Sequence, residues 1–345
     1  MQILLYALLL LFCFVLLARI VDKFFVASLD HISADLKLSH DAAGATLMAI
    51  GSSAPELFVA LFSVLKPGDH EAIGIGSIVG SALFNLLAIG GIVALARKSV
   101  LTWQPVLRDI IFYFIAVALL LWGIFDGSFS VWNALAFLAI YVIYVVAVVN
   151  WRKLFPYKDV DYEPEKPSED CTENGKANLL DKALCFLFPN AENYYLVFLI
   201  SIALIAGLSW VLVEAAIHVS LLLDVPESIV ALTVLAVGTS VPDLISSLIV
   251  ARQGRGDMAM SNAIGSNIFD ILVGLGLPFL IAMTIYGGTI EAKGHNLLSS
   301  SVILFGSLLA FTILLVVKRW RVNWLTGTIL LVLYVFYVVR EIVLL

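Results

Sequence analysis

The chain has 345 residues, of which 61% are hydrophobic and only 13% are charged. Soluble proteins average roughly 45–50% apolar and about 25% charged residues, so this composition excludes a soluble single-core domain. The formal net charge of −6 offers no basic surface to nucleic acid, and we expect no nucleic-acid partner. Because a membrane-spanning helix needs about 20 apolar residues, the chain has material for roughly ten of them.

Long apolar windows, each bounded by charged residues, proline or glycine, follow one another along the chain. They predict spans near residues 3–20, 42–65, 73–95, 106–125, 131–149, 196–219, 229–250, 263–285, 297–317 and 325–339. The first window lacks the basic flank and the cleavage site of a signal peptide, so we interpret it as a span. The predicted fold class is therefore an all-α polytopic membrane protein with ten transmembrane helices.

The basic residues are distributed unevenly between the loops. Seventeen of the 20 Lys and Arg residues fall in one set of alternate loops, and only Lys66, Lys293 and Arg340 fall on the other side. The more basic side of a membrane protein faces the cytoplasm. We therefore expect both termini outside, in a plasma or inner membrane.

One connection is much longer than the others. Residues 151–192 are polar, acidic and proline-rich, which is typical of a flexible linker, and the charge distribution places this linker in the cytoplasm. It divides the chain into two halves of five predicted spans, residues 1–150 and 193–345.

The two halves repeat each other at their most polar points. The segment GSSAPE at 51–56 matches GTSVPD at 238–243 with an offset of 187, and GSALFN at 80–85 matches GSNIFD at 265–270 with an offset of 185. Because five spans is an odd number, the second half enters the membrane from the opposite face. The sequence therefore predicts two inverted five-helix repeats, as in many secondary transporters.

The first motif of each half places a helix break beside hydroxyls and an acid. Pro55 and Pro242 lack an amide hydrogen and disturb the preceding turn, which frees main-chain carbonyl oxygens there. The polar side chains next to the breaks are Ser52, Ser53, Glu56, Thr239, Ser240 and Asp243. Oxygen ligands without His or Cys suit hard cations such as Ca²⁺ and Na⁺.

Such residues also occur in membrane helices for packing alone. An acid in the middle of the membrane, however, costs at least ~2.5–3.5 kcal/mol on insertion scales. The sequence places Glu56, Asp243 and Asp270 at such positions, and the motifs around them are duplicated. A cation site to which both halves contribute explains both observations.

Residues 47–58, 237–247, 256–260 and 265–271 closely resemble the two alpha repeats of the calcium/cation antiporter superfamily. Within it they resemble the sodium/calcium exchangers, and above all the potassium-dependent branch. The resemblance places the alpha-1 repeat at about 40–95 and the alpha-2 repeat at about 227–280, and it implies that spans 1 and 6 slide against the other eight. Proton/calcium exchangers have a similar plan, but their Gly-Asn-x-x-Glu motif is absent from this sequence.

The resemblance also implies a set of cation ligands. Glu56 and Asp243 are the implied calcium carboxylates, assisted by main-chain oxygens of Ser52 and Thr239. One implied sodium position uses the carbonyl of Ala49 with Ser52, Ser81, Ser240 and Glu56, and the other uses the carbonyl of Ala236 with Ser53, Thr239, Ser266 and Asp243. Asn85 and Asp270 complete the implied centre between them.

Asp270 leaves one question open. If all three acids are ionised, the charge of −3 matches Ca²⁺ plus one K⁺, whereas a protonated Asp270 leaves −2, which matches Ca²⁺ alone. The potassium-dependent branch has an acid at this place, and animal potassium-independent exchangers have Asn, but prokaryotic sodium/calcium exchangers can also carry an acid. The charge count and the resemblance together favour potassium dependence without deciding it.

The predicted function is exchange of Ca²⁺ for Na⁺ by alternating access, with or without K⁺ co-transport. A proton/calcium antiporter is the main alternative. An intramembrane aspartyl protease is a remote one, because that chemistry has no use for the hydroxyl-rich repeat. We therefore expect no enzymatic activity and no cofactor besides the transported ions, with inorganic cations and the lipid bilayer as partners and a monomer as the simplest assembly.

Overall fold

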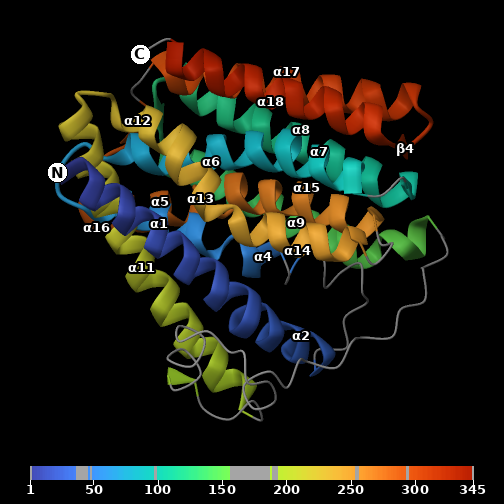
Figure 1. Cartoon of the computed structure of the whole chain (residues 1–345), viewed down its shortest axis with the longest axis horizontal. Coiled ribbons are helices and arrows are strands. Elements are labelled where there is room, and N and C mark those ends of the chain that lie inside the picture. Colours follow the sequence, from blue (N-terminus) through green and yellow to red (C-terminus); the bar gives the residue numbers. More distant parts are fainter. Residues whose placement is uncertain are drawn as a thin grey trace.

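The computed structural model describes residues 2–35, 46, 49–96, 99–155, 187–188, 193–252, 256–292 and 295–343. Within these ranges nine helices are long and apolar enough to cross a membrane, which confirms the all-α polytopic class (Figure 1). Of the predicted span 42–65, the structure describes Thr46 and the residues from Ala49 onward. The count of ten spans therefore stays a prediction. Most of the predicted linker, including residues 156–186, lies outside the described residues.

The elements of the first half follow the predicted spans closely. They are α1 (Gln2–Ile20), η1 (Val21–Phe25), α2 (Val26–Asp35), α4 (Ala49–Ser52), α5 (Ala54–Leu65), α6 (Glu71–Leu83), η3 (Phe84–Ile89), α7 (Gly90–Ala96), β1 (Ser99–Val100), α8 (Trp103–Phe125), β2 (Ser128–Phe129) and α9 (Val131–Leu154). The η elements are π-helical turns inside longer helices. Such turns disturb the regular backbone hydrogen bonding and are frequent at functional sites.

The second half repeats this series. Its elements are α11 (Tyr194–Leu223), α12 (Glu227–Val230), η4 (Ala231–Leu235), α13 (Ala236–Thr239), α14 (Val241–Arg252), α15 (Gly256–Leu272), α16 (Gly276–Tyr286), β3 (Ile290–Glu291), α17 (His295–Val317), β4 (Arg321–Val322) and α18 (Trp324–Val343). The helices α15 and α16 together form one predicted span, which begins seven residues earlier than the sequence suggested, at Gly256.

Two short antiparallel sheets join the halves. β1 pairs with β4, and β2 pairs with β3. In chain order α8 runs from β1 to β2, whereas α17 runs from β3 to β4. The two helices pack against each other, and because their ends lie at opposite sheets they are antiparallel. This crossed pairing of equivalent elements is the arrangement that an inverted repeat produces.

The last helix of each half packs against the other half. The Tyr141 ring lies edge-on to Phe269 at 5.6 Å between centroids, and the Tyr334 ring lies edge-on to Phe84 at 5.4 Å. The segments YVIYVV at 141–146 and YVFYVV at 334–339 are themselves a repeat with an offset of 193. The second half thus packs against Phe84, which precedes Asn85, and the first half packs against Phe269, which precedes Asp270.

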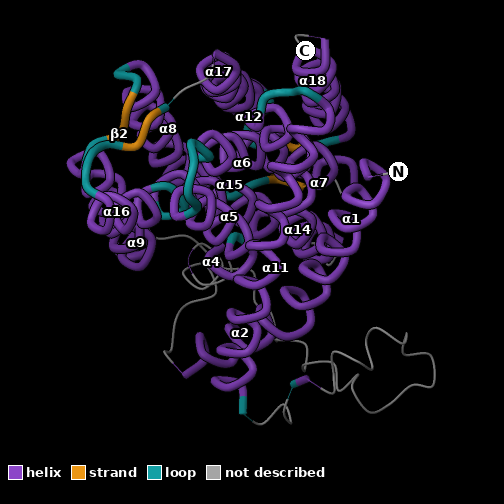
Figure 2. Tube along the Cα trace, turned by 90° about the vertical axis from the view of Figure 1, so that its left-hand side faces the viewer, coloured by secondary structure: helices purple, strands orange, loops and turns teal. Residues whose placement is uncertain are grey.

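The middle of the bundle is formed by α6 and α15, as Figure 2 shows. Within an apolar 18-residue stretch of the span Glu71–Ala96, 89% is buried inside the protein, against 22% for the corresponding stretch of the span Val131–Trp151 at the periphery. Small residues allow helices to approach closely inside a membrane. A Cβ atom at Gly80 would lie 2.4 Å from the Leu232 carbonyl oxygen, so this glycine permits α6 to contact the second half directly.

The helices α1 and α11 run together at a slant to the other helices (Figure 1). Their buried apolar side chains share one cluster, which also takes in residues of α5, α6, α12 and η4 such as Val59, Ile73 and Leu235. The Phe14 ring occupies the space next to Gly238, where a Cβ atom would approach it to 2.2 Å. On α11, the Ser209 hydroxyl donates a hydrogen bond to the Pro55 carbonyl at 3.5 Å. The pair therefore covers both duplicated proline motifs.

We predict that Gly80→Ala destabilises the protein by about 1–3 kcal/mol, because the added methyl group overpacks the contact between α6 and η4. Thermal unfolding in detergent, followed by tryptophan fluorescence, measures the change. Gly306→Ala is the matched control, since a Cβ atom at Gly306 meets no atom within 4 Å. Equal melting temperatures for the two variants would contradict the prediction.

Candidate cation-binding site

Both proline motifs interrupt their helices in the same way. Ser53 lies between α4 and α5 with φ −92° and ψ 6°, and its repeat equivalent Ser240 lies between α13 and α14 with φ −86° and ψ 6°. Pro55 and Pro242 cannot donate the amide hydrogen bond that would reach back four residues. The carbonyl groups of Gly51 and Gly238 consequently lose their regular helical donors at these breaks.

The structure buries all twelve candidate ligand residues. The acids Glu56, Asp243 and Asp270 lie on α5, α14 and α15 and are 0% exposed. Of the other nine, Ser52 is 1% exposed, and the rest are 0% exposed: Ala49, Ser53, Ser81, Asn85, Ala236, Thr239, Ser240 and Ser266. The fold thus gathers both duplicated motifs in its interior.

Glu56 is held by hydroxyls from both halves. Its Oε1 lies 3.1 Å from the Ser240 Oγ and 3.4 Å from the Ser81 Oγ. These two hydroxyl oxygens are 2.9 Å apart, and the Ser81 Oγ also lies 3.3 Å from the Ala236 carbonyl oxygen, so its single hydrogen is donated either to this carbonyl or to Glu56. One carboxylate oxygen is therefore fixed by a small hydroxyl cluster.

Asp243 has a corresponding arrangement. Its Oδ1 accepts from the Ser266 hydroxyl at 3.1 Å, and its Oδ2 accepts from the Asn85 amide at 2.9 Å. The Ser52 hydroxyl lies 3.3 Å from that of Ser266 and 3.5 Å from the Ala49 carbonyl oxygen. Like Glu56, Asp243 contacts side chains of its own half and of the other half.

These contacts differ in two respects from the grouping that the resemblance implies. Ser52 joins the Asp243 cluster instead of the Glu56 cluster, and the Ala236 carbonyl bonds Ser81 on the Glu56 side. The Thr239 hydroxyl donates back to the Leu235 carbonyl at 3.0 Å, which occupies its hydrogen and leaves its lone pairs free.

Several buried oxygens at the centre have no hydrogen-bond partner among the described residues. They are Ser53 Oγ, Glu56 Oε2, Asn85 Oδ1 and both carboxylate oxygens of Asp270. Unsatisfied polar groups are costly in a region without water, and oxygen atoms are the ligands that hard cations prefer. The arrangement therefore suits cations that would occupy the space between these groups.

The acids alone do not make a complete metal site. In the described part of the chain, no three His, Cys, Asp or Glu side chains are placed so that they could hold a metal ion together. Asp270 does interact electrostatically with both Glu56 and Asp243. A cation here would need hydroxyl, amide and main-chain oxygens to complete its coordination, as the residue types at the breaks suggested.

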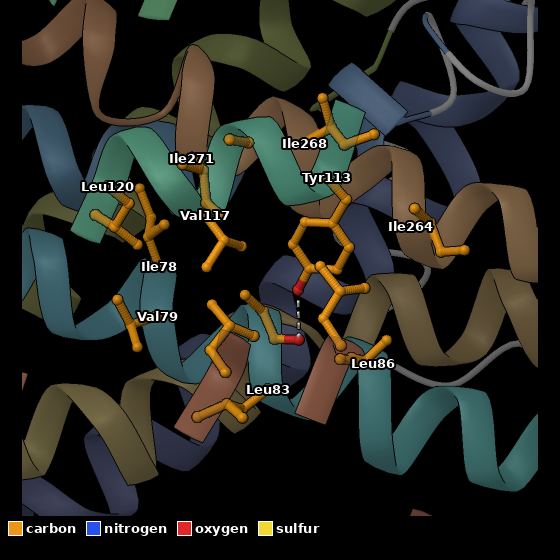
Figure 3. Close-up of a cluster of buried hydrophobic side chains, with 14 of the residues drawn as sticks. Ile78, Val79, Leu83, Leu86, Tyr113, Val117, Leu120, Ile264, Ile268 and Ile271 are labelled. Carbon is orange, nitrogen blue, oxygen red and sulfur yellow. Dashed lines mark hydrogen bonds between the residues drawn. The ribbon is translucent and has the colours of Figure 1, made fainter. Parts of the chain in front are cut away.

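Two further residues next to the centre were not selected from the sequence. The Asn267 amide nitrogen donates to the Ala82 carbonyl at 3.1 Å and to the Tyr113 hydroxyl at 3.0 Å. Asn267 directly follows Ser266 in the second motif, and an amide inside a membrane span is the signal that could have marked it. Tyr113 lies on α8, among the apolar residues of Figure 3, and nothing in the sequence distinguishes it.

Comparison with known proteins is consistent with this geometry. A family model described as "Sodium/calcium exchanger protein" matches residues 6–150 and 193–343. The human protein named "Sodium/potassium/calcium exchanger 4" is 29% identical, and the alignment covers 95% of this chain and 79% of that protein.

Two solved structures show a similar fold. The sodium-calcium exchanger NCX_Mj superposes with a TM-score of 0.62 at 23% identity, covering 98% of each chain. A crystal structure of the H⁺/Ca²⁺ exchanger CAX superposes with a TM-score of 0.71 at 14% identity, covering 98% of this chain and 86% of that one. At these identities the likeness concerns the fold.

We predict that Ca²⁺ raises the melting temperature of the purified protein, because a ligand at about 100 times its Kd stabilises the folded state by about 2.7 kcal/mol. Glu56→Gln and Asp243→Asn should remove this shift while the proteins still unfold cooperatively. Glu341→Gln is the control, since this buried acid is bonded to Ser300 and Arg340 and not to the centre. A full Ca²⁺ shift in either site variant would contradict the assignment.

Proposed function

The chain belongs to the sodium/calcium exchanger protein family, and on this basis we propose that it exchanges Ca²⁺ for Na⁺ by alternating access and carries K⁺ together with Ca²⁺. The observation that carries the proposal is the pair of buried carboxylates, Glu56 and Asp243, which lie on opposite repeats and are each held by side chains of both halves. The relatives named sodium/potassium/calcium exchangers support the choice of ions.

In this proposal Glu56 and Asp243 bind Ca²⁺ between them, with main-chain oxygens of Ser52 and Thr239. The same carboxylates then serve the flanking Na⁺ positions, together with the hydroxyl groups of each motif. Both loads cannot be present at once because they share ligands. Binding of Na⁺ therefore displaces Ca²⁺, and the Na⁺ gradient drives Ca²⁺ across the membrane.

We assign the K⁺ position to the vicinity of Asp270 and Asn85. Both carboxylate oxygens of Asp270 are buried without a partner among the described residues. Three ionised acids carry −3, which Ca²⁺ and one K⁺ neutralise. Because an uncompensated charge in a low-dielectric interior is strongly unfavourable, this match supports K⁺ co-transport.

The helices α1 and α11 are the parts that we propose move. They share an apolar cluster and cover both breaks, through Phe14 at Gly238 and through Ser209 at the Pro55 carbonyl. Sliding of this pair would uncover the site alternately toward each side of the membrane. In the proposed orientation the basic loops and residues 151–192 lie in the cytoplasm, and both termini face outward. The proposal further places the protein in the plasma membrane, as a monomeric carrier without enzymatic activity.

We predict that sodium-loaded vesicles containing the purified protein take up Ca²⁺ when K⁺ is outside, and take up much less when choline replaces K⁺. Glu56→Gln should abolish the uptake, because it removes one of the two shared carboxylates. Calcium flux that a pH gradient drives without Na⁺ would establish a proton/calcium antiporter instead. Flux that needs no counter-ion gradient would establish a channel.

We further predict that Asp270→Asn abolishes the dependence of Ca²⁺ uptake on external K⁺, because the remaining charge of −2 is neutralised by Ca²⁺ alone. Titration of external K⁺ at saturating Ca²⁺ measures the effect. Asp126→Asn is the control, since Asp126 is exposed at the end of α8. An unchanged K⁺ response in Asp270→Asn would exclude this residue from the K⁺ position.

A further inference from the structure

Tyr113 places a single hydroxyl beside the site from an apolar part of the bundle. It is 0% exposed, and its neighbours along the same face of α8 are Ile110, Val117 and Leu120, which are also buried. Figure 3 shows the ring among isoleucine, leucine and valine side chains. Its hydroxyl donates a hydrogen bond to the Ala82 carbonyl oxygen at 3.4 Å. The same hydroxyl accepts a hydrogen bond from Asn267.

This contact fixes the orientation of the Asn267 amide. Both hydrogens of its nitrogen have acceptors, the Ala82 carbonyl and the Tyr113 hydroxyl, so the amide oxygen must point the other way. That oxygen is buried and has no hydrogen-bond partner within the described ranges. A rotated amide would place its oxygen against the Ala82 carbonyl oxygen and lose that bond, and the Tyr113 hydroxyl could bond it only by giving up its own contact with the Ala82 carbonyl.

The oxygen of Asn267 belongs to a group of unsatisfied oxygens around Asp270. Residues three apart on a helix share a face, so Asn267 and Asp270 lie on the same side of α15. The Ser53 hydroxyl lies close enough to the Asp270 carboxylate to interact with it, although no hydrogen bond of normal length joins the two. Tyr113 itself is near enough to Asp270 to interact with it electrostatically.

This polar extension, to which both halves contribute, has no counterpart at the repeat-equivalent positions. The repeat equivalent of Asn267 is Ala82, and that of Asp270 is Asn85. The pairing of the sheets makes β1 equivalent to β3 in the repeat, with an offset of 191 residues. The repeat equivalent of Tyr113 is therefore Leu304, which has no hydroxyl. Asp270, Asn267 and Tyr113 thus occur together on one side of the site, and their repeat equivalents Asn85, Ala82 and Leu304 provide neither the carboxylate nor the hydroxyl.

We propose that Tyr113 is a positioning residue for the monovalent cation that accompanies Ca²⁺. Its hydroxyl holds the Asn267 amide with the oxygen toward Asp270, so that a K⁺ ion there meets the negative end of the amide dipole and not its N–H groups. Neutral oxygen dipoles of this kind replace the hydration shell of K⁺ in proteins. The inference rests on the proposed function, and it adds a determinant of K⁺ affinity that does not touch the ion.

The test is Tyr113→Phe, which keeps the ring and removes the hydroxyl. In sodium-loaded vesicles, the K⁺ concentration for half-maximal Ca²⁺ uptake should rise about fivefold, which corresponds to the loss of about one hydrogen bond of 1 kcal/mol. The maximal rate and the half-saturating Ca²⁺ concentration, both measured at saturating K⁺, should remain unchanged. A merely structural loss would lower the rate and weaken both ions together.

Tyr144→Phe is the matched control. Tyr144 is equally buried, and its hydroxyl donates to Asp109 at 3.1 Å instead of to the site. The control variant should retain the K⁺ affinity of the unmodified protein. A rise equal to that of Tyr113→Phe would overturn the proposal, because it would show a general effect of removing buried hydroxyls.

A double-mutant cycle tests whether Tyr113 acts through Asn267. If it does, Asn267→Ala alone and the double variant with Tyr113→Phe should show the same half-saturating K⁺ concentration. Additive effects would overturn the proposed route.

The unmodified protein separates the failure of this inference from that of the proposed function. Absence of sodium-driven Ca²⁺ uptake would reject the exchange function, and equal uptake in K⁺ and choline would reject K⁺ co-transport and this inference with it. A K⁺-dependent unmodified protein whose half-saturating K⁺ concentration does not change in Tyr113→Phe would reject the positioning role alone.

Discussion

Three carboxylates at 0% exposure in the interior of a membrane protein are the constraint on which the remaining structure depends. An ionised acid that is removed from water needs a compensating charge or strong hydrogen bonds. Here Asp243 accepts two such bonds, Glu56 is approached by the hydroxyls of Ser240 and Ser81, and neither oxygen of Asp270 accepts a hydrogen bond of normal length among the described residues. The protein satisfies these groups only in part, and cations are the complement that the oxygen-rich surroundings favour.

The inverted repeat explains how one short motif can produce a closed site. Each break supplies free carbonyls and hydroxyls on one side only, so a single copy would leave a cation half-coordinated. The second copy, entering from the opposite face, supplies the other half. Because Glu56 is bonded by Ser240 and Asp243 is bonded by Asn85, a cation bound there contacts both repeats, and a relative movement of the repeats must alter its coordination.

The sequence was sufficient to predict the class of fold and the three central acids. Apolar windows identify membrane spans because hydrocarbon tolerates little else, and an acid such as Asp243 inside such a window is conspicuous for the same reason. The partner of Ser52 was not predictable, because the contact with Ser266 joins positions 214 residues apart and depends on how two breaks pack. Tyr113 was missed because a tyrosine in an apolar helix is ordinary until its hydroxyl is located.

The internal repeat was also only partly visible in the sequence. The proline motifs are separated by 187 residues, the second motifs by 185, and the tyrosine segments of α9 and α18 by 193. Loop lengths that differ between the halves change the offset, so a comparison at one fixed offset finds the polar motifs and misses the tyrosines. The structure reveals their equivalence through the crossed contacts of Tyr141 with Phe269 and of Tyr334 with Phe84.

The charges that we propose bind the ions would also explain why transport is coupled. In the proposed cycle, α1 and α11 must pass over the site, and α1 presents to it the apolar ring of Phe14 at Gly238. An apolar surface can cover the carboxylates at low cost only when bound cations neutralise them. An empty site, with up to three negative charges, therefore resists the movement, and either complete cation load permits it. Exchange without a leak follows from this electrostatic condition, without a separate gate.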